Sequence, residues 1–257
     1  MTKNVFLAII IISLMIWITW RMFFKKQNRA HRPFPEAWKV ILKNEVRFYR
    51  LLSPRDKDRF EQMVLNFLDK ITITGVETEI DDTDKLLVAS SAIIPLFEFP
   101  DWEYRNLNEV LLYDNYFNQE YETRGEERNI SGMVGSGAMN RMMILSKPAL
   151  HQGFENTNSK SNVGIHEFIH LLDKSDGETD GIPEVIMEQQ YVIPWLKMMH
   201  NEIREIKSGH SDINPYGATN EAEFFSVISE YFFKRPLLLK KNHPELFEIL
   251  EKVFRID

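Results

Sequence analysis

The chain has 257 residues, of which 44% are hydrophobic and 27% are charged, so it can form one sizeable core and is too apolar to be disordered. Its net charge of -7 disfavours direct, non-specific binding to nucleic acid. Because it has no cysteine, disulfides and thiolate metal sites are excluded, and any metal must use histidine and carboxylate ligands.

The N-terminus is a long uncharged segment. Residues 5–20 read VFLAIIIISLMIWITW, and the apolar stretch reaches residue 24, about the length that spans a bilayer. A cleaved signal peptide is one alternative, but its shorter apolar region would be followed by small residues rather than by RMFFKK. A buried core helix is another. The pattern favours a retained transmembrane anchor over residues 1–24.

Basic residues around this segment predict its orientation. Lys3 precedes it, whereas the basic residues that follow it are Arg21, Lys25, Lys26, Arg29 and Arg32. The positive-inside rule then puts the C-terminal side in the cytoplasm. We therefore expect a single-pass protein of the inner (cytoplasmic) membrane, with a basic linker over 25–34 and a catalytic domain over 35–257 facing the cytoplasm.

Amphipathic helices are expected after the linker. The first lies near 36–51, and the second starts at Ser53-Pro54, a good N-cap followed by a first-turn proline. The apolar residues of the second follow the helical spacing and are Phe60, Met63, Val64, Phe67 and Leu68. A third, mainly helical segment is expected over 84–97.

Short apolar runs at 71–74, 110–113 and 142–145 predict strands, and the polar, glycine-rich region 115–140 predicts a long loop with a hairpin. From residue 161 onward the pattern is mostly helical, with Pro194 kinking or breaking the helix expected over 184–207. The fold class is therefore α+β, mostly helical with a small mixed sheet. The strand 142–145 is either an ordinary core strand or the edge at which an extended peptide binds.

The segment SNVGIHEFIHLLD carries the strongest chemical signal. Its apolar residues repeat at helical spacing, so His166 and His170 lie one turn apart on one side of a helix with Glu167 beside them. Two imidazoles can then reach one ion, and two histidines with one carboxylate suit Zn²⁺. The alternative is an ordinary amphipathic helix with solvated polar residues.

A zinc peptidase site needs a third protein ligand, and the segment TNEAEFFSVISEYFF offers three carboxylates. Glu221 lies in the first turn, where the helix dipole explains it. Glu223 and Glu230 are seven residues apart and so share one face. The pattern alone leaves the choice between these two open.

The two motifs, HEFIHLLD and YGATNEAEFFSVISEYFF, and their separation resemble the Mlc titration factor A family of zinc peptidases. They are also similar to the catalytic domain of anthrax toxin lethal factor. The resemblance covers about residues 34–240 and includes FPDWEYRNLNEVLLY. It implies a zincin-like metallopeptidase domain, whereas the predicted transmembrane helix lies outside the matching motifs.

The resemblance also assigns roles. The metal ligands that it implies are His166, His170 and Glu223, with Glu167 as the general base and Tyr216 as a donor to the developing oxyanion. The resemblance implies that Asp173 hydrogen-bonds a ligand imidazole. Glu230 is likewise expected to contact the ligands and not the metal itself.

Two functions follow as expectations. The first is a membrane-anchored zinc peptidase that hydrolyses a peptide or protein substrate with a water activated by Glu167. An aminopeptidase is one type of peptidase that fits this expectation. The second is a regulatory protein that binds and sequesters a transcriptional repressor, because the family includes a protein of that kind. Binding alone requires neither Glu167 nor the ligands, so the intact motif favours the peptidase.

Overall fold

The structure is a computed structural model that describes residues 13, 17, 32–125 and 128–256. Phe34–Asp257 form one compact unit. The described elements, in chain order, are α2 (Glu36–Glu45), α3 (Arg47–Leu51), α4 (Pro54–Leu68), β1 (Thr72–Val76), α5 (Asp82–Ile93), β2 (Glu109–Tyr113), β3 (Gly132–Val134), η1 (Gly137–Met139), β4 (Met142–Ser146), α6 (Lys147–Glu155), α7 (Val163–Asp173), η2 (Lys174–Asp176), α8 (Gln189–Lys207), η3 (Pro215–Ala218), α9 (Glu221–Lys234), α10 (Pro236–Asn242) and α11 (Pro244–Phe254). The boundaries between the expected anchor, linker and catalytic domain, at residues 24 and 34, stay predictions.

The sheet has four strands in the order β1-β2-β4-β3. β1, β2 and β4 are parallel, and β3 is antiparallel to β4, with Met133 opposite Ile144. The mostly helical α+β fold with a small mixed sheet is thus confirmed. The suggestion that the strand at 142–145 pairs with a peptide is wrong, because β4 has β2 on one edge and β3 on the other. The two edge strands of the sheet are β1 and β3.

Local signals explain where the helices begin. Ser53 caps α4 by accepting a hydrogen bond from the amide of Asp56 at 3.2 Å. The helix expected over 36–51 is divided at Val46, whose backbone is extended and separates α2 from α3. The helix expected over 184–207 begins later, at Gln189, and continues through Pro194.

A buried ionic cluster joins α5 to α6. Asp84 is fully buried and completes the capping box of α5. Its carboxylate contacts Lys147 Nζ at 2.8 Å and His151 Nε2 at 2.7 Å, both from α6. Burial alone would raise the pKa of Asp84, but these hydrogen bonds outweigh it and lower the pKa to about 2. The ionised carboxylate therefore holds the two helices together.

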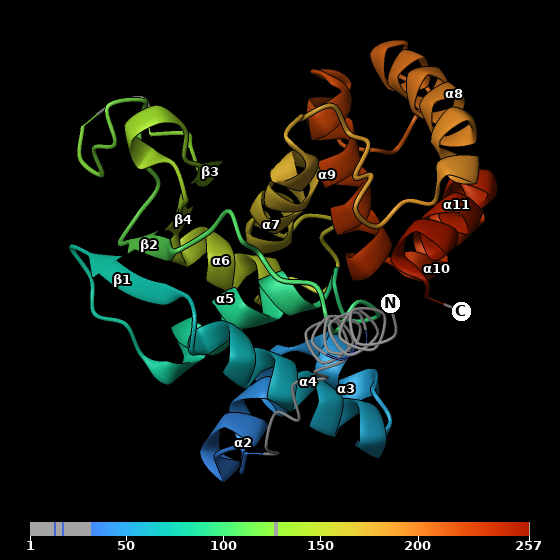
Figure 1. Cartoon of the computed structure of the whole chain (residues 1–257). Helices are drawn as coiled ribbons and strands as arrows, with labels where there is room; N and C mark the ends of the chain where they lie inside the picture. The colour runs from blue at the N-terminus through green and yellow to red at the C-terminus, as the bar shows by residue number, and fades with distance from the viewer. Residues whose placement is uncertain (1–12, 14–16, 18–31, 126–127, 257) are drawn as a thin grey trace, which may run out of the picture. The chain divides into compact units, whose positions relative to one another are not determined.

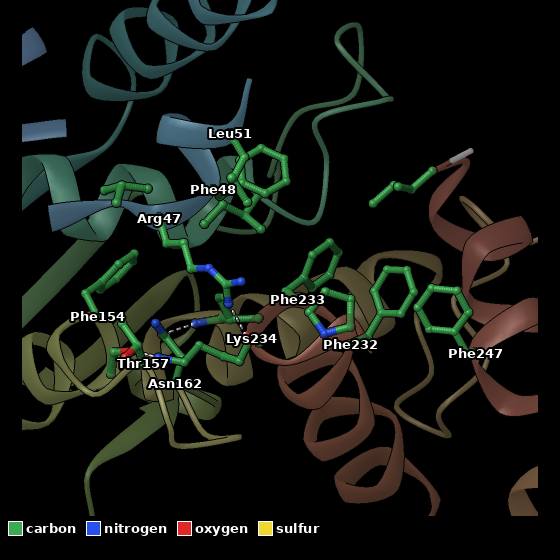
Figure 2. A pocket seen from close by; sticks show the side chains of 16 residues that line it. Arg47, Phe48, Leu51, Phe154, Thr157, Asn162, Phe232, Phe233, Lys234 and Phe247 are labelled. Atoms are coloured by element: carbon green, nitrogen blue, oxygen red, sulfur yellow. Dashed lines mark hydrogen bonds between the residues drawn. The ribbon is translucent and has the colours of Figure 1, made fainter. Parts of the chain in front are cut away.

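The centre of the compact unit is the packed pair α7 and α9, with the sheet beside α7 and with α8, α10 and α11 around α9 (Figure 1). Phe168 of α7 packs against Phe67 of α4, with 5.7 Å between ring centroids. Phe225 of α9 packs against Trp195 of α8 in the same way. An apolar cavity lies beside the C-terminal end of α9, next to Phe232 (Figure 2).

The predicted location in the inner membrane is corrected. Within residues 13, 17, 32–125 and 128–256, no helix combines the length and the apolar character needed to cross a bilayer. The longest of them, α8, has 19 residues but carries charged side chains such as Lys197, Glu202 and Arg204. The segment 1–24, on which the prediction rested, lies outside the described residues apart from positions 13 and 17.

Candidate metal centre

Helix α7 presents two histidines on one side. Its N-cap Asn162 accepts a hydrogen bond from the amide of Ile165 at 3.0 Å, which fixes the start of the helix. Phe168 and other apolar residues of α7 are buried in the core and set its rotation. His166 and His170 consequently meet on the opposite side, with their Nε2 atoms 3.1 Å apart.

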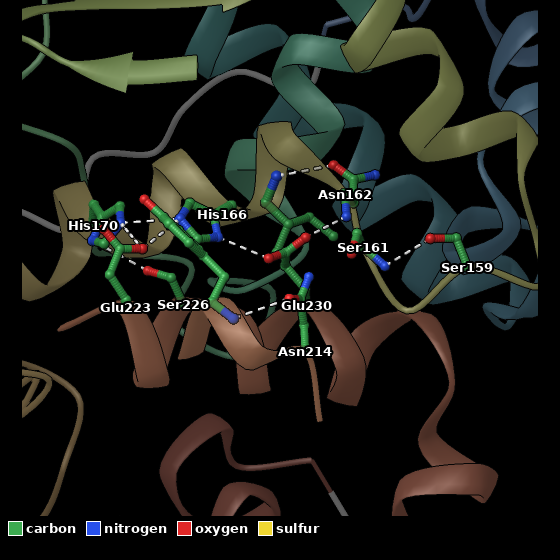
Figure 3. Close-up of polar contacts among 11 residues, drawn as sticks. Ser159, Ser161, Asn162, His166, His170, Asn214, Glu223, Ser226 and Glu230 are labelled. Carbon is green, nitrogen blue, oxygen red and sulfur yellow. Dashed lines mark hydrogen bonds and ion pairs between the residues drawn. The ribbon is translucent and has the colours of Figure 1, made fainter. Parts of the chain in front are cut away.

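Helix α9 supplies a carboxylate to the same point. Asn220 caps α9 by accepting from the amide of Glu223 at 2.8 Å, so Glu223 lies in the first turn. Its Oε2 lies 3.1 Å from Nε2 of His166 and 3.3 Å from Nε2 of His170 (Figure 3). The structure thus brings together three side chains separated by up to 57 positions.

The three donor atoms fit a metal ion. One atom from each of His166, His170 and Glu223 lies within 4.8 Å of the others. An ion with tetrahedral bonds of about 2.0–2.1 Å holds its ligands roughly 3.3–3.4 Å apart, close to the separations between these atoms. Two imidazoles and a carboxylate are also the donors that suit such an ion. These residues can therefore hold a divalent metal.

The Nδ1 atom of each imidazole, which points away from the three donor atoms, contacts a side chain of α9. Glu230 Oε1 lies 2.7 Å from Nδ1 of His166, and its second oxygen accepts a hydrogen bond from the amide of Asn162. Ser226 Oγ lies 3.2 Å from Nδ1 of His170. Contacts of this kind leave Nε2 free for a metal and fix the orientation of the ring.

Asp173 does not take the position expected for it. Its Oδ2 accepts from the amide of Gly181 at 2.9 Å, and its Oδ1 has no hydrogen-bond partner among the described residues. Because Asp173 ends α7, its side chain contacts the loop that follows the helix, and Ser226 contacts His170 instead. Burial raises the pKa of Asp173 to about 6.

Glu167 lies beside the three donors without being one of them. Its side chain is buried, and it lines a cavity of about 430 Å³ together with His166, His170, Glu223 and Tyr216. Burial raises the pKa of Glu167, and the two imidazoles oppose this shift. A carboxylate in this position can accept a proton from a water molecule in the cavity.

A family model described as Glucose-regulated metallo-peptidase M90 matches residues 20–255. The chain belongs to this family. A protein of Synechocystis is 28% identical over 252 residues, which are 94% of this chain and 90% of that protein. Mlc titration factor A of Pectobacterium atrosepticum is 26% identical over 86% of each chain, and Mlc titration factor A of Escherichia fergusonii is 25% identical over 87% of each.

The charged side chains of this site shift one another's pKa values. Burial would lower the pKa of His166, but hydrogen bonds to Glu223 and Glu230 outweigh it and raise the pKa to about 10. Burial would raise the pKa of Glu223, but hydrogen bonds from His166 and His170 hold it well below its usual range. The carboxylates thus surround the imidazoles with negative charge, which favours a cation.

Tyr216 lies on the open side of the site. It belongs to η3, is 53% exposed, and its ring centroid is 6.0 Å from that of His166. Partial burial and the negative charge of Glu223 raise the pKa of Tyr216 to about 12. The hydroxyl therefore keeps its proton near neutral pH and can donate a hydrogen bond to an oxyanion.

Sequence reasoning missed several residues around this site. Ser226 is three positions after Glu223, so its place on the same face of α9 was a usable signal. Gly132 falls in the region expected to form a long loop with a hairpin, but it begins β3, where an added Cβ would lie 2.7 Å from Glu167. Lys174 also lines the cavity, although nothing in its sequence context distinguishes it from a helix-terminal lysine.

Proposed function

We propose that the chain is a zinc-dependent peptidase in which His166, His170 and Glu223 hold the ion and Glu167 is the general base. The observation that carries the proposal is a buried carboxylate, Glu167, in the same cavity as three converging metal donors. Membership of a metallo-peptidase family supports the same conclusion. When bound, zinc supplies a Lewis acid that polarises a carbonyl and acidifies water.

The side chains of the site have distinct tasks. Glu167 takes a proton from the attacking water, holds it, and passes it to the leaving amine. Its raised pKa favours the holding step. Tyr216 donates its hydroxyl proton in a hydrogen bond to the developing oxyanion. Ser226 and Glu230 keep the two imidazoles in place while this happens.

The edge strand β3 offers a place for an extended substrate. Gly132, Met133 and Val134 line the same cavity as Glu167. β3 is the last strand of the sheet, so its outer edge pairs with no other strand in the described part of the chain. A peptide that adds to this edge by main-chain hydrogen bonds would lie beside Glu167.

Replacing Glu167 tests this function. Glu167→Gln should keep its zinc and lower the cleavage rate by about 10²–10⁴, because an amide cannot accept the proton. Tyr216→Phe should lower the rate by about 10²–10³. Glu221→Gln is the matched control, since this α9 carboxylate pairs with His200 at 3.4 Å rather than with the donors.

Cleavage is measured on a peptide library, with metal content determined for each variant. Peptides with free and with acetylated N-termini in the library distinguish aminopeptidase from endopeptidase activity. The proposed chemistry is refuted if Glu167→Gln retains its zinc and cleaves as fast as the parent.

The name of several relatives supports a second candidate function. They are called Mlc titration factor A, a name that describes the binding of a protein. We propose as the alternative that this chain binds and sequesters a transcriptional regulator. Partner binding should survive Glu167→Gln and Tyr216→Phe, since neither removes a large surface. A parent chain that cleaves no peptide but binds a regulator tightly would favour this alternative.

A further inference from the structure

A second cavity lies away from the metal donors. It has a volume of about 180 Å³, and five phenylalanines line it: Phe48, Phe154, Phe232, Phe233 and Phe247 (Figure 2). None of the proposed ligands, nor Glu167, belongs to its lining. An apolar cavity of roughly 150 Å³ is large enough to admit benzene. This one can therefore take an apolar group of at least that size.

One wall of the cavity contains a buried donor with no partner. Asn162 is 1% exposed, and its Oδ1 accepts the capping hydrogen bond from the amide of Ile165. The cap identifies the oxygen, so the remaining atom is Nδ2, which has no hydrogen-bond partner among the described residues. A buried amide without a partner is unfavourable. A ligand that brings an acceptor oxygen would satisfy it.

Two cations line the same wall. Arg47 donates to the carbonyl of Lys234 at 3.2 Å, and Lys234 Nζ donates to the carbonyls of Gly153 and Asn156. Within the described part of the chain, neither cation forms an ion pair with a carboxylate. Burial lowers the pKa of Lys234 to about 8; the positive charge of Arg47 adds to this shift, and the negative charge of Glu230 opposes it.

These donors converge. A Cβ on Gly153 would lie 3.1 Å from Nδ2 of Asn162, and the carbonyl of the same glycine accepts from Lys234. Arg47 reaches toward Lys234 from α3, whereas the rings of Phe232 and Phe247 lie on the other side (Figure 2). The cavity thus has a cationic, donor-rich end and an aromatic end.

We propose that this cavity binds a single-chain fatty carboxylate. The carboxylate accepts from Arg47, Lys234 and Asn162, and the alkyl chain lies among the phenyl rings. An amine with the same chain would meet two cations, and an alcohol would lack the charge that pairs with them. The proposal does not rest on peptide hydrolysis, because the two cavities have separate linings.

Calorimetric titration of the full chain with decanoate tests the proposal, with 1-decanol and decylamine as comparison ligands. We expect one decanoate per chain, 1-decanol binding at least about tenfold more weakly, and no binding of decylamine. Arg47→Gln should weaken decanoate binding about tenfold and leave 1-decanol unchanged. Arg50→Gln is the matched control, because this neighbouring arginine donates to Lys43 and Asn44 outside the cavity.

Leu51→Glu provides a second test that does not disturb the core. Leu51 lines the cavity but is 74% exposed, so the change puts a negative charge at the mouth without filling buried space. It should weaken decanoate binding and not that of 1-decanol. The proposal is overturned if decanoate binds no better than 1-decanol, or if Arg47→Gln and Leu51→Glu both bind decanoate as the parent does.

Discussion

Gly132 of β3 is a position where a single added methyl group should disturb catalysis. A Cβ at this residue would lie 2.7 Å from Cγ and Oε1 of Glu167 and 2.8 Å from Cγ2 of Val163. Non-bonded carbon atoms pack at about 3.5–4.0 Å, so Glu167 or the strand must move by roughly 1 Å. A displacement of that size at a reacting group costs about 10²-fold in rate. We expect Gly132→Ala to lower kcat to that extent.

The assay compares kcat for a peptide substrate with the metal content of the same preparation. Metal binding should be retained, because the three atoms nearest to the added Cβ belong to Glu167 and Val163 and not to a proposed ligand. Ser131→Ala is the control, since it alters the neighbouring position without adding an atom beside Glu167. A Gly132→Ala variant with the kcat of the parent would refute the reasoning, and so would loss of metal in parallel with loss of activity.

Glu223→Gln should lose most of its metal, whereas Glu230→Gln should bind it about 10–100-fold more weakly, because Glu230 contacts Nδ1 of His166 and none of the three donor atoms. Chelator competition measures both, and metal loss in Glu230→Gln alone would contradict the ligand assignment. Ser226→Ala should weaken metal binding more than Asp173→Asn, since the hydroxyl contacts an imidazole and the carboxylate does not; the reverse order would contradict this. The pKa of Asp84, lowered to about 2, means that its ionised form stabilises the fold above about pH 4 and that this stabilisation is lost toward pH 2. Asp84→Asn should therefore lower the free energy of unfolding in urea by about 2 kcal/mol at pH 7 and by little near pH 2, and an equal loss at both would count against the cluster.

Helical spacing predicted much of the framework, because each helix buries one apolar face. The cap at Ser53 was identified from its own residue type and its proline neighbour. The relation between His166 and His170 also follows from the geometry of a single helix. These features depend only on residues that are close together in the sequence, so the sequence alone can predict them.

Features that depend on the packing of separate elements were less accessible. The pattern could not decide between Glu223 and Glu230, since both occur on one face of α9 and only its placement against α7 distinguishes them. The expectation for Asp173 failed because the end of α7 turns this side chain toward Gly181. The edge strand β3 has only three residues, within a glycine-rich region that carries no clear strand pattern.

Glu223, Ser226 and Glu230 form a stripe through which one helix can both present a proposed metal ligand and orient the two imidazoles. These residues are spaced by three and four positions, so they form one row along α9 that faces α7. Glu223 meets both Nε2 atoms, and the other two meet the Nδ1 atoms from behind. A shift of α9 by one turn would replace every one of these contacts together. The caps Asn162 and Asn220, which fix where the two helices begin, therefore set the geometry of the site as much as the donors do.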